Sequence, residues 1–216
     1  MKVKVQADIL GANDRIAREN SQLFAAKGVY VINIMSSPGA GKTTLLEKTI
    51  AALKDRYAIG VIEGDVATTA DAERIEKAGV PVVQINTGSA CHLDGSMIRG
   101  ALEEFDLDSL DLLIVENVGN LVCPAEFNLG ERHKVMLLSV AEGDDKPLKY
   151  PLMFRESTAL VINKTDLIPY TNFDMDKATK DSLSINPALN IMPVSCRSGE
   201  GLDAWYGWLE SGLAAR

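Results

Sequence analysis

The chain has 216 residues, of which 46% are hydrophobic and 24% charged, and these values predict one folded domain, residues 1–216, with a sizeable core. The net charge of -8 disfavours nucleic acid and anionic membrane surfaces as partners, because both require a basic protein face. No apolar run is long enough to span a bilayer and the N-terminus lacks a secretory signal, so we expect a cytoplasmic protein whose three cysteines form no disulfides.

Hydrophobic spacing predicts that helices and strands alternate along the chain. The first predicted element is a helix over about 8–27, where Ile9, Ile16 and Leu23 recur at helical spacing before Gly28. Strands are predicted over 29–35, 58–65, 81–87, 110–117, 134–140, 158–164 and 191–195. Further helices are predicted over 43–55, 69–79, 95–105 and 202–213, with a solvated acidic turn over 141–147. This alternation predicts an α/β fold, with a mostly parallel sheet covered by helices on both faces.

The stretch SSPGAGKTT, residues 36–44, follows the first predicted strand and opens a helix, which is the context of a phosphate-binding P-loop. Its backbone amides and the helix N-terminus favour an anion. Lys42 can reach the β- and γ-phosphates of a nucleotide, and the Thr43 hydroxyl can ligate Mg²⁺. Ser36 stands where the P-loop pattern has its first glycine, a departure that affects only the opening turn. The residues predicted to bind phosphate here are Ser37, Pro38, Gly39, Ala40, Gly41, Lys42, Thr43 and Thr44.

A second motif, NKTD at residues 163–166, follows a predicted strand downstream of the P-loop and predicts guanine as the base. The Asp166 carboxylate can accept hydrogen bonds from both guanine donors, whereas adenine presents an acceptor at the same place. Asn163 can bond the other edge of the purine, and the stem of Lys164 can cover its ring. Backbone amides after the last predicted strand are expected to bind the guanine oxygen, and they belong to Ser195, Cys196 and Arg197.

Acidic residues end two of the predicted buried strands and are candidates for binding Mg²⁺ or orienting the attacking water. Glu116 ends one of these strands, whereas Glu63 and Asp65 end the other. We assign Asp65 and Glu116, with Thr43, to the magnesium site. Gly119 can bring a backbone N–H to the γ-phosphate. The residues assigned to catalysis are Lys42, Asp65 and Glu116.

Two cysteines and a histidine can gather at one end of the sheet, because the C-terminal ends of parallel strands lie together. Cys91 and His92 are neighbours after the third predicted strand, and Cys123 lies just beyond the segment expected to sense the γ-phosphate. Thiolate and imidazole suit Zn²⁺ and Ni²⁺ far better than Mg²⁺, and a second protomer could complete the coordination shell. The alternative is a packed thiol beside a surface imidazole. Cys196 is expected to be a packed thiol and His133 a solvated residue.

Five segments together resemble the HypB-type GTPase of nickel-iron hydrogenase maturation, over about residues 8–210: SSPGAGKTTLLEKTI, VIEGDVATTADAERI, NTGSACHLDGSMI, ENVGNLVCPAEFNLGE and NKTDL. The resemblance implies a SIMIBI-class P-loop NTPase with a three-layer fold. It implies a homodimer that delivers nickel to the hydrogenase large subunit, with a companion nickel-maturation protein as a further partner. It also implies a metal site at the dimer interface, made by Cys91, His92 and Cys123. The N-terminal cysteine motif or histidine-rich stretch of many members is absent from this sequence, so nickel storage is not expected.

These residues predict a switch to which GTP or GDP and a metal ion, Ni²⁺ or Zn²⁺, both bind. GTP and Mg²⁺ are expected to order the loops after Asp65 and Glu116, which favours a homodimer that completes the metal site. Hydrolysis then loosens the loops and releases the metal. Because no residue is recognisable as an arginine finger, we expect the isolated protein to hydrolyse GTP slowly.

Three other interpretations make different predictions. A urease-type nickel GTPase is expected to carry Cys-Pro-His, whereas Cys123 and Pro124 are followed here by Ala125. A P-loop small-molecule kinase leaves the NKTD motif without a role and predicts a pocket for an acceptor substrate. A signalling GTPase with a structural zinc predicts a metal ion that stays bound in both nucleotide states.

Overall fold

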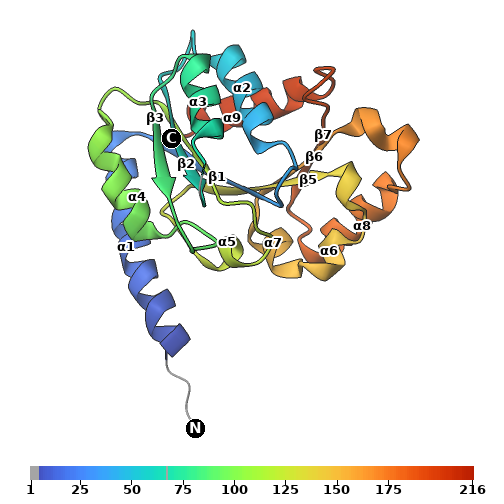
Figure 1. The fold of residues 1–216 in the computed structure, drawn as a ribbon, viewed down its shortest axis with the longest axis horizontal. Coiled ribbons are helices and arrows are strands. Elements are labelled where there is room, and N and C mark those ends of the chain that lie inside the picture. Colours follow the sequence, from blue (N-terminus) through green and yellow to red (C-terminus); the bar gives the residue numbers. More distant parts are fainter. Residues whose placement is uncertain (1–4, 67) are drawn as a thin grey trace.

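The computed structural model describes residues 5–66 and 68–216, and the strands in this part of the chain form one seven-stranded sheet (Figure 1). The strand order is β3-β2-β4-β1-β5-β6-β7, and every neighbouring pair is parallel. The strands are β1 (Tyr30–Ser36), β2 (Ile59–Asp65), β3 (Val82–Asn86), β4 (Leu112–Glu116), β5 (His133–Ser139), β6 (Ala159–Asn163) and β7 (Asn190–Pro193). Each predicted strand is therefore present, within two residues of its expected ends.

Helices cover both faces of this sheet, which confirms the predicted three-layer arrangement (Figure 1). One face packs against α2, α3 and α9, and the other against α1 and α4 on one side and α5, α7 and α8 on the other. The helices are α1 (Val5–Lys27), α2 (Lys42–Leu53), α3 (Ala70–Ala78), α4 (Gly95–Ala101), α5 (Cys123–Glu126), α6 (Lys146–Lys149), α7 (Pro151–Glu156), α8 (Met175–Ile185) and α9 (Leu202–Ala214). Short 3₁₀ turns are η1 (Leu102–Glu104), η2 (Val140–Glu142) and η3 (Thr165–Tyr170).

Strand β1 lies in the middle of the sheet and is buried along its whole length. Ile32 and Ile34 point into the layer formed with α2 and α9, whereas Val31 packs with α1 and α4. Met35 packs in the third cluster, with α5, α7 and α8. A strand buried on both faces favours apolar residues on both sides, which is why β1 is largely apolar rather than alternating. Its buried Asn33 is hydrogen-bonded to the side chains of Glu131 and Asn117.

Two helix ends in the first half of the chain follow directly from sequence chemistry. Gly79 ends α3 in the left-handed conformation, which glycine adopts without steric cost. Asp94 caps α4 and accepts hydrogen bonds from the backbone N–H groups of Ser96 and Met97 at 2.9 and 2.8 Å. This cap fixes the end of the loop that carries Cys91 and His92.

Helices α5, α6, α7 and α8 were not predicted from the sequence. The helices α5, α6 and α7 have only four, four and six residues, so no helical periodicity develops in them. Residues 141–147 were expected to form a solvated turn, but they contain the end of η2 and the start of α6. Helix α1 begins at Val5, three residues before its predicted start. Among the described residues, no helix is both long and apolar enough to cross a membrane.

The prediction that His133 is solvated is wrong. Its ring is half-buried at the start of β5, with centroids 5.8 Å from the Tyr30 ring and 5.4 Å from the Trp208 ring. Burial lowers the pKa of His133, and the nearby Arg132 acts in the same direction. The local sequence GERHK is polar, but strand pairing places this one side chain against α9.

Candidate nucleotide and metal sites

The loop between β1 and α2 has the conformation that a phosphate cradle requires. Gly39 and Gly41 have φ angles of 76° and 104°, so both occupy the left-handed region. A Cβ on Gly41 would lie 2.6 Å from Nδ2 of Asn163, so only glycine fits this approach of two loops. The loop opens directly onto the N-terminus of α2, where unpaired backbone N–H groups favour an anion.

Ser36 replaces the first glycine of the P-loop pattern without strain. Among the described residues only Lys164 is a non-glycine with positive φ, so Ser36 has an ordinary backbone conformation. Its fully buried hydroxyl donates to the Ser37 carbonyl at 2.7 Å and accepts from Nζ of Lys42 at 3.1 Å. The opening turn therefore needs no glycine, and the serine holds the lysine that was predicted to reach the phosphates.

The NKTD motif lies against the phosphate loop. Nδ2 of Asn163 donates to the Ala40 carbonyl at 2.9 Å, and Nζ of Lys164 donates to the Gly39 carbonyl at 2.7 Å. Asn163 is only 1% exposed, and its Oδ1 accepts from the backbone N–H groups of Lys164 and Cys196 at 2.7 and 3.2 Å. Asn163 therefore connects the base loop to the phosphate loop, and it also lines the pocket where the purine edge was predicted to lie.

A pocket of about 360 Å³ lies beside these loops. Its lining residues are Gly41, Thr44, Asn163, Lys164, Asp166, Leu167, Cys196 and Arg197. Asp166 is half-buried, and its Oδ1 accepts from the Ser195 hydroxyl at 2.6 Å. The thiol of Cys196 packs in the core behind the pocket, as predicted, and burial raises its pKa to about 11. Seven of the base-site and loop residues predicted from sequence thus share one pocket, and Ser195 supports it from behind.

A second pocket of about 240 Å³ lies at the C-terminal ends of β2 and β4. Its lining residues are Pro38, Gly39, Lys42, Glu63, Gly64, Asp65, Val66, Asp71, Glu116, Asn117, Val118 and Gly119. A Cβ on Gly119 would lie 3.0 Å from backbone and ring atoms of Pro38, so the loop after β4 packs tightly on the phosphate loop. This pocket contains Lys42, Asp65, Glu116 and Gly119, which were predicted to act at the γ-phosphate.

Three carboxylates converge in this second pocket, those of Glu63, Asp71 and Glu116, with oxygens all within 4.8 Å of one another. Thr43 Oγ1 donates to Glu116 Oε1 at 3.0 Å. The buried Oε2 atoms of Glu63 and Glu116 have no hydrogen-bond partner among the described residues. Buried carboxylate oxygens without a donor fit a divalent cation, which prefers oxygen ligands. The residues present therefore fit the predicted Mg²⁺.

Burial sets the protonation of these acids. It raises the pKa of Glu63 to about 8, and the Glu116 and Asp65 carboxylates add to the shift. It also raises the pKa of Glu116 to about 7, although Lys42 and the Thr43 hydrogen bond act in the opposite direction. Near neutral pH the cluster therefore carries protons that a bound cation would have to displace.

Of the two acids assigned to the magnesium site, Asp65 and Glu116, only Glu116 belongs to the cluster, which also contains Glu63 and Asp71. Asp65 lines the pocket, but its carboxylate accepts from Val66 N at 2.6 Å and from the Thr68 hydroxyl at 2.7 Å. Asp71, which sequence analysis overlooked, takes its place beside Glu63 and Glu116, and Arg74 holds it through a hydrogen bond of 3.1 Å. One feature of the sequence could have identified Asp71: it is an acidic residue in the first turn of the helix that follows β2, the strand that ends with Glu63 and Asp65.

The predicted transition-metal ligands also meet. Cys91, His92 and Cys123 have ligand atoms all within 4.8 Å of one another, and the two sulfurs are 2.9 Å apart. The His92 Nδ1 lies 3.7 Å from the Cys91 sulfur. Both thiols are free, Cys91 is exposed and Cys123 is half-buried. A set of two thiols and one imidazole fits Ni²⁺ or Zn²⁺, and its exposure leaves room for further ligands.

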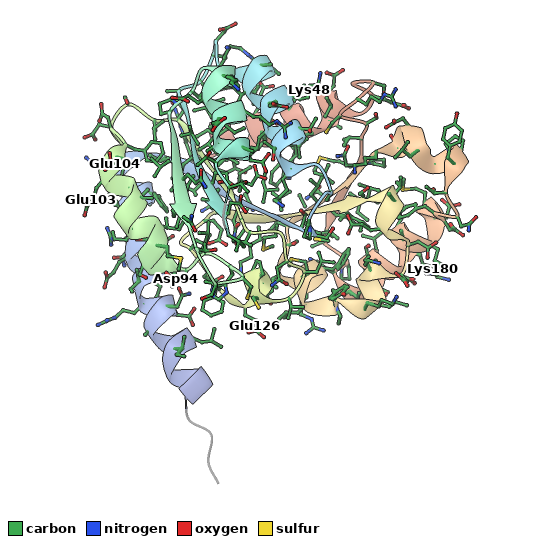
Figure 2. The ribbon with its side chains drawn as sticks, viewed as in Figure 1. Lys48, Asp94, Glu103, Glu104, Glu126 and Lys180 are labelled. Carbon is green, nitrogen blue, oxygen red and sulfur yellow. The ribbon has the colours of Figure 1, made fainter. Side chains whose placement is uncertain are left out.

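Neighbouring groups tune these ligands. The hydrogen bond with Cys91, and then burial, raise the pKa of Cys123. Burial lowers the pKa of His92, whose ring lies against Phe127 with centroids 3.9 Å apart, so the imidazole is neutral and able to coordinate at pH 7. The nearby carboxylates, Asp94 and Glu126, lie at the edge of the molecule between α4 and α5 (Figure 2), where they favour a cation.

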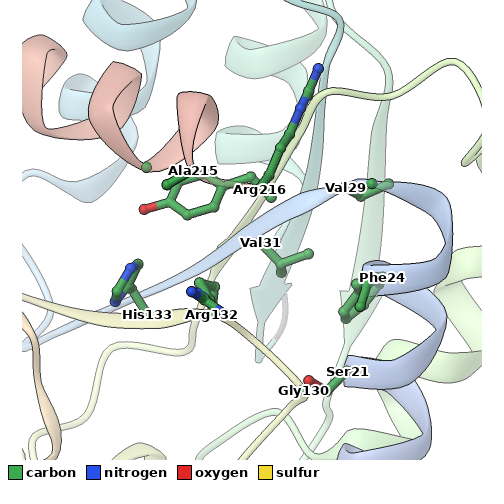
Figure 3. A pocket seen from close by; sticks show the side chains of 13 residues that line it. Ser21, Phe24, Val29, Val31, Gly130, Arg132, His133, Ala215 and Arg216 are labelled. Atoms are coloured by element: carbon green, nitrogen blue, oxygen red, sulfur yellow. The ribbon is translucent and has the colours of Figure 1, made fainter.

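A third pocket, of about 200 Å³, lies between the C-terminal ends of α1 and α9 (Figure 3). Ser21, Phe24, Arg132, His133 and Arg216 are among its lining residues. None of the residues predicted to bind a nucleotide or a metal lines this pocket, so it is separate from both sites.

Comparison with known proteins places these sites in a family. The model of the CobW/HypB/UreG nucleotide-binding domain matches residues 30–193. The hydrogenase maturation factor HypB of Escherichia coli (strain K12) is 51% identical over 209 residues, which cover 97% of this chain and 72% of that protein. The structure of HypB from Helicobacter pylori in complex with nickel aligns with a TM-score of 0.89 at 43% identity, over 94% of this chain and 96% of that one. HypB from Archaeoglobus fulgidus aligns with a TM-score of 0.89 at 40% identity, covering 94% and 99%.

Proposed function

Because this chain belongs to the HypB family of hydrogenase maturation factors, we propose that it is a GTP-hydrolysing nickel carrier that acts in the maturation of nickel-iron hydrogenase. The observation that carries the proposal is the convergence of Cys91, His92 and Cys123 on loops next to the nucleotide site. The nickel complex of the Helicobacter pylori relative supports nickel as the ion. The expected partners are a second copy of this chain, the hydrogenase large subunit and a companion nickel-maturation protein, in the cytoplasm.

In this proposal the phosphate loop and Lys42 bind the β- and γ-phosphates of GTP, and Ser36 keeps the lysine in place. Thr43, Glu116 and Glu63 would hold Mg²⁺, which when bound would neutralise charge that develops on the phosphates. Asp65, which was predicted to hold Mg²⁺ or to orient the attacking water, lines the same pocket and can take either role.

Base selection is assigned to the pocket formed by NKTD and the loop after β7. The Ser195 hydroxyl donates to Asp166 and so fixes the carboxylate that would accept both guanine donors. Asn163 fixes the position of the base loop relative to the phosphate loop, because its amide binds both. Of the three backbone amides predicted to bind the guanine oxygen, that of Ser195 donates to Glu200 O and that of Cys196 to Asn163 Oδ1. The Arg197 amide, in the same pocket, remains the predicted partner.

Nickel is the cargo of the proposed reaction. Cys91 and Cys123 lose their protons when they bind it, and His92 supplies a neutral imidazole. In the GTP state the loop after β4 is held against the phosphate loop, two protomers associate, and each supplies one Cys-His-Cys set. Hydrolysis loosens this loop, opens the dimer and releases nickel to the acceptor.

The proposal is tested by nickel titration followed by sedimentation, with GDP and with a non-hydrolysable GTP analogue. The GTP-analogue state is expected to dimerise and to bind about one nickel per protomer, because each protomer supplies one ligand set. Nickel affinity in the GDP state is expected to differ, and nickel must then tighten the GTP-state dimer by the same factor. Equal nickel affinity in both nucleotide states would show that nickel binding is not coupled to the nucleotide, and the proposed switch would be wrong.

The buried acids predict an unusual pH dependence of stability. Because the folded pKa of Glu63 is raised to about 8 and that of Glu116 to about 7, the folded protein binds more protons than the unfolded chain above pH 4.5. The metal-free protein should therefore lose about 3–4 kcal/mol of stability between pH 6 and 8. Glu63→Gln should remove much of this loss and stabilise the metal-free protein at pH 8, as measured by urea unfolding.

Magnesium affinity should move in the opposite direction. Since the cation binds ionised carboxylates, its affinity in the nucleotide complex should rise with pH over the same interval, and Glu63→Gln should lower it. Glu103→Gln is the matched control, because Figure 2 shows Glu103 on the surface near α4, outside the cluster. A Glu63→Gln protein with the same pH profile as the wild type would remove Glu63 from the site.

A further inference from the structure

The metal ligands lie on two loops that belong to different parts of the chain. Cys91 and His92 precede α4, whereas Cys123 begins α5 after β4. Two asparagines of the second loop bind the backbone of the first: Oδ1 of Asn117 accepts from Leu93 N at 3.1 Å, and Nδ2 of Asn120 donates to Cys91 O at 3.3 Å. These two bonds lie on either side of His92, so they control how the Cys-His pair sits relative to Cys123.

Asn117 is itself fixed by the nucleotide side of the molecule. It is 1% exposed and immediately follows Glu116, the acid that accepts from Thr43 of the phosphate loop. Its Nδ2 donates to Oδ1 of Asn33 on β1 at 3.1 Å, and its backbone N–H donates to Ile34 O at 3.0 Å. A buried carboxamide with this many partners has one orientation. Any shift of Glu116 is therefore passed to Leu93.

Asn120 makes the corresponding link at the other end of the loop after β4. It follows Gly119, which packs on Pro38 of the phosphate loop. Its Oδ1 accepts from Val122 N at 2.8 Å, so the same side chain fixes the turn before Cys123 and the carbonyl of Cys91. The 2.9 Å separation of the two sulfurs thus depends on this residue.

The far end of the first loop is held independently, by α1. Gly95 N donates to Oδ1 of Asn13 at 2.8 Å, and Nδ2 of Asn20 donates to Gly95 O at 2.9 Å. Figure 1 shows α1 and α4 side by side, as these bonds require. Because Gly95 is anchored to a helix while Leu93 and Cys91 are bound to the loop after β4, a movement of that loop must turn the segment that carries His92.

We propose that Asn117 and Asn120 are positioning residues that set the geometry of the nickel ligands according to the nucleotide state. The inference rests on the proposed function and adds the link between its two sites. Asn117 moves with the neighbouring Glu116 at the phosphate end of the loop. Asn120 moves with the neighbouring Gly119, which packs on the phosphate loop. Neither is assigned as a nickel or phosphate ligand.

The experiment measures nickel affinity by competition with a chelator, in the GDP and GTP-analogue states, for Asn117→Ala and Asn120→Ala. Asn120→Ala should bind nickel about 10-fold more weakly, as expected for residues that orient metal ligands. Asn117→Ala should move the ratio of nickel affinities in the two nucleotide states toward one. The nickel–thiolate absorption bands should shift in both variants, while nucleotide affinity without nickel stays unchanged in Asn120→Ala, because Asn120 lines neither nucleotide pocket.

Asn186→Ala is the matched control, because Asn186 also binds backbone carbonyls, those of Phe154 and Ser157, far from both sites. Its nickel affinity and spectrum should match those of the wild type even if its melting temperature falls. If Asn117→Ala does not fold, the half-buried Asn120 still tests the link.

The possible failures are distinguishable by including Cys91→Ala. If Cys91→Ala loses nickel but both asparagine variants keep wild-type affinity, spectrum and nucleotide dependence, the positioning role is wrong and the proposed function stands. If Cys91→Ala binds nickel as the wild type does, the metal site itself is wrong and the inference falls with it.

Discussion

Lys42→Ala should lower the rate of GTP hydrolysis by about 100-fold or more, because it removes the cation nearest to the charge that develops on the phosphates. It should also weaken triphosphate binding more than diphosphate binding, since the γ-phosphate loses its direct partner. Folding should survive. Lys42 is half-buried at the tip of the loop, and the hydrogen bond it loses, to the Ser36 hydroxyl, is worth about 0.5–1.5 kcal/mol.

Phosphate release under single-turnover conditions measures this effect, with thermal unfolding as the check on folding. Lys48→Ala is the control, because Lys48 lies on the same helix and is exposed, and it lines neither pocket of the nucleotide site (Figure 2). It should keep wild-type turnover. A Lys42→Ala protein that hydrolyses GTP at the wild-type rate would refute the assignment of this loop to phosphate binding.

The parts of the fold that sequence predicts well are those with local rules. The five inner strands, β2, β4, β1, β5 and β6, are largely apolar and buried on both faces, a pattern that predicts strands of a parallel sheet, whereas the edge strands β3 and β7 are only partly buried. The phosphate loop needs glycines at positive φ and lies between a strand and a helix, which a short motif specifies completely. By contrast, α5 and α6 have four residues each; α5 packs against α7, and α6 against α7 and α8, and no local pattern encodes these tertiary contacts.

In the candidate site, too, residues with a local sequence signal could be predicted, whereas residues that depend on tertiary contacts could not. Glu116 and Thr43 are recognisable because each sits at a fixed position after a strand or within a motif. Asp71 joins them only because α3 returns over the end of β2, so its role depends on a helix direction that sequence does not give. The motif predicts Asn163 at the base pocket, which it lines, but the hydrogen bond from its amide to the Ala40 carbonyl could not be predicted from sequence. Long-range contacts of this kind need the assembled sheet.

Cys91→Ala and Cys123→Ala should each weaken nickel binding by about 100-fold or more, because an imidazole and one thiolate rarely hold a transition metal at neutral pH. His92→Ala should have a smaller effect, since water can replace the imidazole. In wild type the affinity should rise with pH, because both thiols must lose protons to bind, and the raised pKa of Cys123 extends this rise to higher pH.

Cys196→Ala is the matched control for these two variants. Its thiol packs in the core behind the base pocket, so its loss should lower stability while nickel affinity stays at the wild-type value. GTP affinity of the monomer should be unchanged in Cys91→Ala and Cys123→Ala, because neither residue lines a nucleotide pocket. In sedimentation with the GTP analogue, however, nickel should no longer tighten the dimer of either variant, since linkage requires bound metal. Wild-type nickel affinity in Cys91→Ala would show that the two thiols meet for packing alone.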